Sequence, residues 1–303
     1  MISLPCALLL VAGCTGGEAA KPAPAGPRTA FNGPAALDYV RQQLAFGPRV
    51  PGTPAHVRAG DWIVAQMRAR ADTVIEQTWT HVTVAGDTLR LRNILARYRP
   101  EATERVLYLT HWDTRPISDQ ASDTAQRRIP VPGANDGASG VALFLALGDA
   151  LHAAAPGVGV DLLFVDGEDY GNFDRDTDVL MGSRWFADHL PSPGYKPLFG
   201  VLWDMIGDRD LQIFHENHSL AQAPEVVARV WQTALELGYS NYFIPQSRYA
   251  VTDDHLPLLA KGLRVIDVID LDYSDHHKPT DTLDKVSAAS LQVVGDVALT
   301  LVK

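Results

Sequence analysis

The sequence predicts an α/β fold in three layers, with a mixed, mainly parallel central sheet. Short apolar runs with many β-branched and aliphatic residues are typical of buried strands. Such runs occur at 106–110, 160–165, 198–203 and 263–269. Longer segments with helical periodicity separate most of them. This alternation of strands and helices favours a parallel sheet that is covered on both faces.

The other elements follow from periodicity and from the residues at their ends. Helices are expected at 36–45, 56–70, 140–151, 224–237 and 291–301. Pro48 stops the first helix, and Gly238 follows the fourth as a C-terminal glycine. The third helix is apolar nearly all round, which predicts that it is buried. A hairpin is expected where 82–84 and 89–98 flank a short turn.

The composition is that of an ordinary globular protein and excludes some functions. Of the 303 residues, 46% are hydrophobic and 20% are charged. A formal net charge of -10 leaves no basic footprint, so no nucleic-acid partner is expected. The two cysteines, Cys6 and Cys14, both lie near the start, so no disulfide framework is expected in the rest of the chain.

The N-terminal region has the composition of an export signal. Residues 1–13 carry no charge, and their apolar core is far shorter than the ~20 residues that span a bilayer, so we predict a signal peptide. Val11-Ala12-Gly13-Cys14 resembles the lipobox of bacterial lipoproteins. We therefore expect an exported protein, lipid-anchored at Cys14 on the periplasmic side of the cell envelope. A periplasmic or secreted protein with no lipid is the alternative.

The rest of the chain divides simply. Residues 14–30 are rich in Gly, Ala and Pro and are expected to form a tether. Residues 31–303 are expected to form a single catalytic domain. In open α/β sheets the active site lies outside the carboxyl ends of the strands, so the chemistry is expected there.

The first two candidate sites follow the strand at 106–110. His111 comes directly after this strand, and Asp113 is placed to orient the His111 imidazole because residues two apart on an extended chain point the same way. The small residues at 133–140 let the backbone approach other groups closely. A carboxylate at the centre of this loop would repel phosphate, so we interpret Asp136 as a cation ligand, although it also suits a helix N-cap.

The remaining candidates follow the later strands. The strand at 160–165 is followed by Asp166, Glu168 and Asp169. These carboxylates would repel one another, and a divalent ion would relieve the repulsion, while a raised pKa on one of them gives a general base. Asp204 ends the next strand, Asp253 precedes an apolar run, and His276 and His277 follow the last strand.

Carboxylates and imidazoles without a thiolate suit a catalytic zinc ion. The candidate set is His111, Asp136, Glu168, Asp169, Asp204 and His277. A calcium loop at 174–185 is excluded because its sixth residue is Val179 and its twelfth is Trp185. A serine hydrolase is disfavoured because neither Ser139 nor Ser183 lies in a G-x-S-x-G motif.

Together these pieces resemble the zinc aminopeptidases of metallopeptidase family 28, and within them the glutaminyl-peptide cyclotransferases. The resemblance covers roughly residues 34–303. Its motifs are Phe46-Gly47-Pro48-Arg49, His111-Trp112-Asp113, Gly133 to Gly140, Asp166-Gly167-Glu168-Asp169, Met181-Gly182-Ser183-Arg184, Asp204-Met205-Ile206-Gly207, Asp253-Asp254-His255 and His277 with Asp281. It implies the three-layer fold of the zinc exopeptidases.

The resemblance also implies a role for each candidate. Asp136, Asp169 and His277 match the ligands of the zinc ion that both subfamilies share. Glu168 matches the general acid/base. His111 and Asp204 match the ligands that complete a second zinc site in the aminopeptidases, where Asp136 bridges the two ions. In the cyclases, which bind one zinc ion, the residues matching Asp204 and Asp253 form a hydrogen-bond network beside it.

Three residues depart from the family pattern. The second acidic residue after the strand is usually Glu and is Asp169 here. The cyclases place Trp immediately before the last metal ligand, where this chain has His276, and Asp267 replaces a His of the animal cyclases. The pocket that receives the substrate is therefore expected to differ.

The sequence thus predicts a zinc enzyme that acts on the amino termini of peptides or proteins. The preferred hypothesis is a glutaminyl cyclase with one zinc ion, which converts N-terminal Gln to pyroglutamate and releases ammonia. An aminopeptidase with two zinc ions is the alternative. A non-catalytic binding lipoprotein is a third, which the presence of Glu168 disfavours.

Overall fold

The computed structural model describes residues 29–303, so the predicted signal peptide and residues 14–28 of the predicted tether lie outside the described residues. The described chain begins with a contact to the opposite end of the sequence. The Thr29 N–H and hydroxyl donate to Asp296 Oδ1 over 3.0 Å and 2.5 Å. Across residues 29–303, none of the helices is both long and apolar enough to pass through a membrane.

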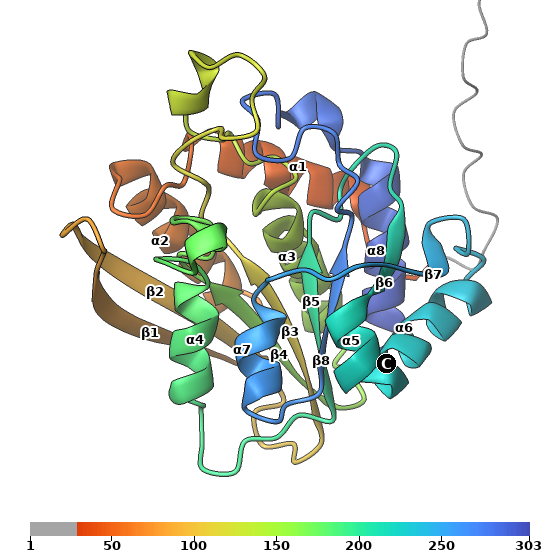
Figure 1. Ribbon diagram of the computed structural model, residues 1–303. Helices are drawn as coiled ribbons and strands as arrows, with labels where there is room; N and C mark the ends of the chain where they lie inside the picture. Colours follow the sequence, from red (N-terminus) through yellow and green to blue (C-terminus); the bar gives the residue numbers. More distant parts are fainter. Residues whose placement is uncertain (1–28) are drawn as a thin grey trace, which may run out of the picture.

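The main sheet of the described residues has six strands in the order β1-β2-β4-β3-β5-β8 (Figure 1). These strands are β1 Thr73–Val82, β2 Thr88–Tyr98, β3 Arg105–His111, β4 Gly159–Val165, β5 Phe199–Asp204 and β8 Val265–Ile269. β4, β3, β5 and β8 are parallel, whereas β2 pairs antiparallel with both β1 and β4. The prediction of a mixed, mainly parallel sheet is therefore confirmed.

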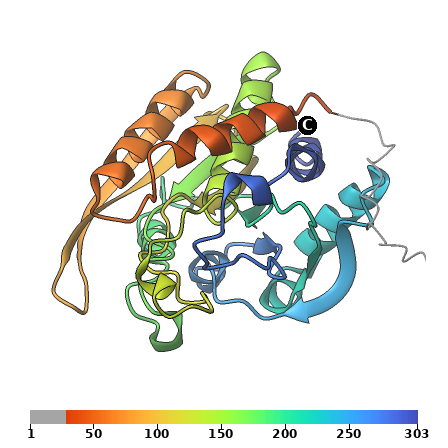
Figure 2. The same ribbon diagram turned by 90° about the horizontal axis from the view of Figure 1, so that it is seen from above.

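Helices cover both faces of this sheet, as the two views in Figures 1 and 2 show. One layer contains α1 Gly33–Leu44, α2 Pro54–Arg68, α3 Ala138–Ala153 and α8 Ala288–Thr300. The opposite layer contains α4 Met181–Asp188, α5 Asn217–Gln222 and α7 His255–Ala260. α6 Pro224–Glu236 packs against α8 and ends before Gly238, which has the predicted left-handed conformation with φ +79°. Short 3-10 turns occur at Gln126–Arg128, Phe173–Arg175 and Leu283–Lys285.

The core is divided by the sheet because alternate side chains of each strand point to opposite faces. On β3, Val106 and Tyr108 belong to the core cluster beneath α1, α3 and α8. Leu107 and Leu109 belong to a second cluster, together with residues of α4 and α7. Because both faces are covered, the strand reads as a continuous apolar run.

Two parts of the fold differ from the prediction. β1 begins at Thr73, nine residues before the predicted strand. The prediction missed this part because β1 is an edge strand, half of its side chains face solvent, and its sequence is largely polar. β6 Ile213–Glu216 and β7 Phe243–Tyr249 form a small parallel sheet that was not predicted. Most of the β7 residues are exposed, so they carry no apolar pattern.

Candidate metal centre and active site

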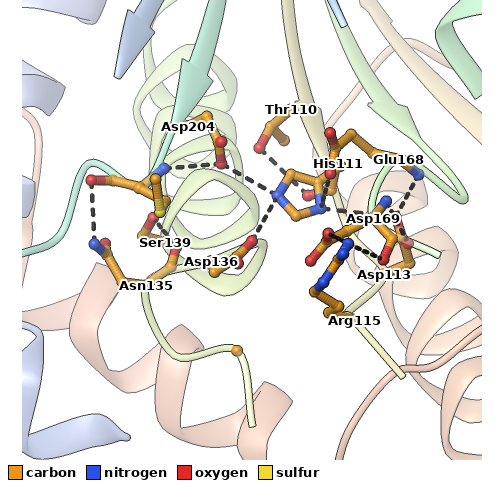
Figure 3. A network of polar contacts seen from close by, with 12 residues as sticks. Thr110, His111, Asp113, Arg115, Asn135, Asp136, Ser139, Glu168, Asp169 and Asp204 are labelled. Carbon is orange, nitrogen blue, oxygen red and sulfur yellow. Dashed lines mark hydrogen bonds and ion pairs between the residues drawn. The ribbon is translucent and has the colours of Figure 1, made fainter. Parts of the chain in front are cut away.

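The carboxyl ends of the parallel strands meet at one edge of the sheet, and the predicted polar residues lie there. His111 is the last residue of β3, and Asp204 is the last residue of β5. His111 Nε2 lies 3.1 Å from Asp204 Oδ1 and 3.1 Å from Asp136 Oδ1 (Figure 3). The structure therefore brings together three of the predicted site residues, all of them buried.

Asp136 is placed by a loop that packs tightly against the end of β3. A Cβ atom at Gly137 would lie 2.6 Å from the Asp113 carbonyl oxygen, and one at Gly140 would lie 1.9 Å from Thr110 Oγ1. Only glycine fits at such separations. The N-cap of α3 is Gly137, and no side chain caps the helix, so the alternative N-cap role of Asp136 is wrong.

A buried carboxylate holds the same loop from the other side. Asp281 accepts the backbone N–H of Asn135 over 2.9 Å and that of Asp136 over 3.2 Å. The Tyr273 hydroxyl donates to Asp281 Oδ1 over 2.6 Å. Burial, followed by the nearby charge of Asp136, raises the pKa of Asp281 to about 7. The backbone at Asp136 is thus fixed on both sides.

His277 reaches the site from a loop that follows β8. Its Nε2 atom lies 3.3 Å from Asp169 Oδ1 and 3.7 Å from Asp136 Oδ2, while its Nδ1 atom lies 3.3 Å from Asp119 Oδ1. Its backbone is left-handed, with φ +52°, which is uncommon for a residue with a side chain. Burial alone would lower the pKa of His277, but Asp169 and Asp119 raise it to about 10.

Arg115 forms an ion pair with Asp169 at the same edge. Arg115 Nη1 donates to Asp169 Oδ1 over 2.6 Å, and its guanidinium also donates twice to Asp119. Asp119 therefore joins Arg115 to His277. One oxygen of Asp169 is occupied by these contacts, and its other oxygen, Oδ2, is buried without a hydrogen-bond partner.

Asp113 supports the acidic turn after β4 rather than forming a close bond to His111. Its two oxygens accept the backbone N–H groups of Glu168 and Asp169 over 3.1 Å and 3.2 Å. Its distance to His111 Nδ1 is 3.6 Å, longer than a hydrogen bond. Asp113 therefore positions the backbone of Glu168 and Asp169, and it does not form the predicted hydrogen bond to the His111 imidazole.

A cavity of about 370 Å³ opens at this edge of the sheet. Carboxylates and imidazoles line part of it: Asp136, Glu168, Asp204, Asp253, His276 and His277. Apolar side chains line other parts of the wall: Phe173, Met205, Val251, Ile269 and Leu271. A lining that combines apolar side chains with a few polar groups is typical of a small-molecule or side-chain pocket.

The charges around the cavity shift the acid–base properties of its residues. Burial, followed by the repulsion of Asp169 and Asp253, raises the pKa of Glu168 well above 4.5, although His111 opposes this. Burial and Asp204 likewise raise the pKa of Asp253. A buried carboxyl group with a raised pKa is suited to general acid/base chemistry near neutral pH.

Two groups of side chains in this cavity have the spacing of metal ligands. One consists of His111, Asp136 and Asp204, and the other of Asp136, His276 and His277; within each, the ligand atoms lie within 4.8 Å of one another. Asp136 Oδ2 and Asp169 Oδ2 are buried without a hydrogen-bond partner among the described residues. Unsatisfied carboxylate oxygens beside imidazoles fit a divalent cation such as zinc.

Several residues that shape the site were not assigned a role from the sequence. They are Arg115, Asp119, Gln120, Tyr273 and Asp281. Arg115, Asp119, Gln120 and Asp281 contact partners that are distant in sequence, and Tyr273 acts through Asp281, so spacing gave no signal. Only Asp281 lay within a quoted motif.

Comparison with known proteins agrees with this arrangement. The model of Peptidase family M28 matches residues 93–302. The chain belongs to this family. A crystal structure of Porphyromonas gingivalis glutaminyl cyclase is similar to this M28 chain, with 38% identity, coverage of 89% of this chain and 97% of that one, and a TM-score of 0.86. A Zn-dependent exopeptidase from Parabacteroides distasonis has 34% identity, coverage of 92% and 99%, and a TM-score of 0.87.

A curated relative gives the same result at lower identity. The glutaminyl-peptide cyclotransferase-like protein of Bos taurus is 27% identical over 73% of this chain, which spans 62% of that relative's length. The predicted family and fold class are confirmed, and the M28 chain is an enzyme of a zinc-dependent metallopeptidase family. This disfavours the hypothesis of a non-catalytic binding lipoprotein.

Proposed function

We propose that the chain is a zinc-dependent glutaminyl-peptide cyclotransferase that acts on amino-terminal Gln of peptides or proteins. The observation that carries this proposal is the position of Glu168, a buried carboxyl group with a raised pKa in the wall of the cavity that also contains the metal-ligand groups. The similarity to a glutaminyl cyclase over 97% of that chain supports it.

Asp136, Asp169 and His277 would hold the zinc ion that both subfamilies share. Asp136 and Asp169 each keep one buried oxygen without a hydrogen-bond partner, and His277 Nε2 lies 3.7 Å from Asp136 Oδ2 and 3.3 Å from Asp169 Oδ1. When bound, zinc acts as a Lewis acid that polarises a carbonyl group of the substrate. Asp119 holds His277 through Nδ1, which orients Nε2 toward the cavity.

Glu168 moves the proton in the proposed reaction. The carboxylate of Glu168 accepts a proton from the α-amine of the substrate as this nitrogen attacks the side-chain amide carbon of Gln. The C–N bond of the amide then breaks, and the protonated Glu168 returns the proton to the departing nitrogen, which leaves as ammonia. Asp204 and Asp253 line the same cavity. The charge of Asp204 raises the pKa of Asp253, and that of Asp253 raises the pKa of Glu168.

An aminopeptidase is the second candidate because of one specific observation. His111, Asp136 and Asp204 form a second group with metal-ligand spacing that shares Asp136 with the first. Two ions bridged by one carboxylate can stabilise both the attacking and the leaving groups of a hydrolysis. In this case Glu168 would take its proton from the attacking water.

One assay separates the two functions. The purified protein would be incubated with matched peptides that begin with Gln or Leu, and released ammonia and free amino acids would be measured separately, together with zinc per chain. We expect ammonia from the Gln peptide, no free Leu and one zinc ion. Free Leu without ammonia and two zinc ions would overturn the cyclase proposal.

We also propose that the protein is exported and anchored by a lipid at Cys14. The lipobox-like sequence Val11-Ala12-Gly13-Cys14 supports this. Metabolic labelling with radioactive palmitate in a bacterial host is expected to label the wild type but not Cys14→Ser. Equal labelling of both proteins, or of neither, would contradict the proposal.

A further inference from the structure

Two consecutive histidines face the same cavity. His276 and His277 both line it, and the centroids of their rings are 3.8 Å apart. On an extended chain, consecutive side chains point in opposite directions. Here residues 274–277 form a turn, His277 has a left-handed backbone, and both imidazoles line the cavity.

The positions of these rings relative to Asp136 are those of a metal-ligand set. One ring nitrogen of His276, one of His277 and one oxygen of Asp136 all lie within 4.8 Å of one another. Asp136 Oδ2 is buried without a hydrogen-bond partner. Two imidazole nitrogens and a carboxylate are a common set of protein ligands at catalytic zinc sites.

Two consecutive residues, Asp119 and Gln120, contact the Nδ1 atoms of the two rings. Asp119 Oδ1 lies 3.3 Å from Nδ1 of His277, and the amide nitrogen Nε2 of Gln120 lies 3.4 Å from Nδ1 of His276. In this orientation the amide N–H donates to Nδ1; turning the amide over by 180° would bring its oxygen to Nδ1 instead, where it would accept the ring proton and leave the Nε2 lone pair free for a metal ion. Metal-binding histidines are normally supported by an acceptor of this kind.

Asp169 is a weaker donor than its position in the sequence implies. Its carboxylate is one methylene shorter than the usual Glu of this family, and Oδ1 accepts a 2.6 Å hydrogen bond from Arg115. The positive guanidinium withdraws electron density from the carboxylate. Asp169 also lies outside both groups that have metal-ligand spacing.

We propose that His276 is a ligand of the zinc ion, together with Asp136 and His277. It provides the nitrogen donor that offsets the shorter, Arg-bound Asp169. His276 stands where the cyclase pattern has Trp, which cannot bind a metal ion through an imidazole nitrogen. The inference depends on zinc binding but not on whether the enzyme is a cyclase or an aminopeptidase.

The test measures metal binding rather than activity. Wild type, His276→Ala, His276→Asn and the control His152→Ala would be compared as full chains. His152 is an exposed residue of α3. Zinc affinity would be measured by competition with a chromophoric chelator, and the visible absorption spectrum would be recorded after cobalt(II) substitution. Thermal unfolding in excess chelator would show whether each metal-free variant folds.

We expect both His276 variants to bind zinc at least ~10-fold more weakly than the wild type and to have an altered cobalt spectrum. His152→Ala should match the wild type in both measurements. Wild-type affinity and an unchanged cobalt spectrum in a folded His276 variant would overturn the inference while leaving the proposed function intact. A wild-type protein that binds no zinc would overturn both.

Discussion

Two clusters of buried charged side chains lie near opposite ends of the parallel strands. They differ in how many of their polar atoms have hydrogen-bond partners. Near the start of β4, Asp161 accepts hydrogen bonds from Arg97, Arg105 and Tyr195, at distances of 2.7 to 2.9 Å. At the carboxyl ends of the parallel strands, Asp136 and Asp169 each have one buried oxygen atom without a hydrogen-bond partner. Both clusters are buried.

This difference separates a structural cluster from a functional one. A buried charge is tolerated when hydrogen bonds and opposite charges compensate for the loss of solvation. Asp161 meets that condition within the chain. The cluster at the carboxyl ends of the strands does not, because two of its carboxylate oxygens have no hydrogen-bond partner and its carboxylates repel one another, as expected if it forms the proposed zinc site.

The largest effect is expected from removing the ligands themselves. Asp136→Ala and His277→Ala should each lose zinc and reduce turnover to background, because both side chains are placed to contact the metal. Zinc per chain, measured by inductively coupled plasma spectrometry after dialysis, checks this. Wild-type zinc stoichiometry in either variant would remove that residue from the ligand set.

Glu168→Gln should lower turnover by ~100- to 10,000-fold while zinc stays bound. The substitution keeps the size of the side chain but removes its ability to accept a proton. Steady-state rates measured alongside zinc content distinguish this from loss of the metal. A variant that kept more than about a tenth of the activity would contradict the assigned role.

Asp161→Asn should destabilise the protein by about 3–5 kcal/mol, because it leaves the buried guanidinium of Arg105 without its charged partner. Chemical denaturation of the metal-free protein measures this change in the free energy of unfolding. The variant should bind zinc as tightly as the wild type. An unchanged unfolding midpoint would show that the hydrogen bonds of Asp161 do not stabilise the folded state and would contradict its structural role.

Asp267→Asn should do the opposite. Both carboxylate oxygens of Asp267 are buried without hydrogen-bond partners. Burial, followed by the charges of Asp253 and Asp204, raises its pKa well above 3.8. The folded state therefore holds the proton more tightly than the unfolded state does, so stability is lost as the pH rises from about 3.8 toward the raised pKa.

The amide cannot ionise, so the variant should lack this pH-dependent loss. We expect it to be more stable than the wild type at neutral pH, with a smaller decrease of the unfolding free energy as the pH rises above about 3.8. Denaturation at several pH values checks this. A variant less stable than the wild type at every pH would indicate a structural role for this carboxylate.

His111→Ala should have the smallest effect on turnover if the enzyme is a cyclase. Zinc content should stay at one per chain, and the variant should keep much of its activity, because His111 is not a ligand of the shared ion. In a two-metal aminopeptidase, the same substitution should lower both metal content and rate severely. Parallel measurement of zinc and ammonia release distinguishes these results.

The sequence predicts the parallel strands and their terminal residues well because both depend on local pattern. β3 is buried along its whole length, and its residues 106–109 are all apolar or aromatic, as expected for a strand covered on both faces. β1 was largely missed because its exposed edge position allows a polar sequence. The partners Arg115, Asp119 and Gln120 lie in a long loop, and their contacts with Asp169 and the two histidines depend on tertiary folding alone.

The two hydrogen bonds accepted by Asp113 determine how Glu168 and Asp169 can move relative to each other. The backbone of Glu168 and that of Asp169 are attached to the same carboxylate. A small displacement of the turn therefore shifts the proton acceptor and its neighbour together, so their mutual spacing is preserved while their common position changes. Asp113 follows β3, whereas Glu168 and Asp169 follow β4. A movement of the end of β3 would therefore move two residues that belong to the neighbouring strand.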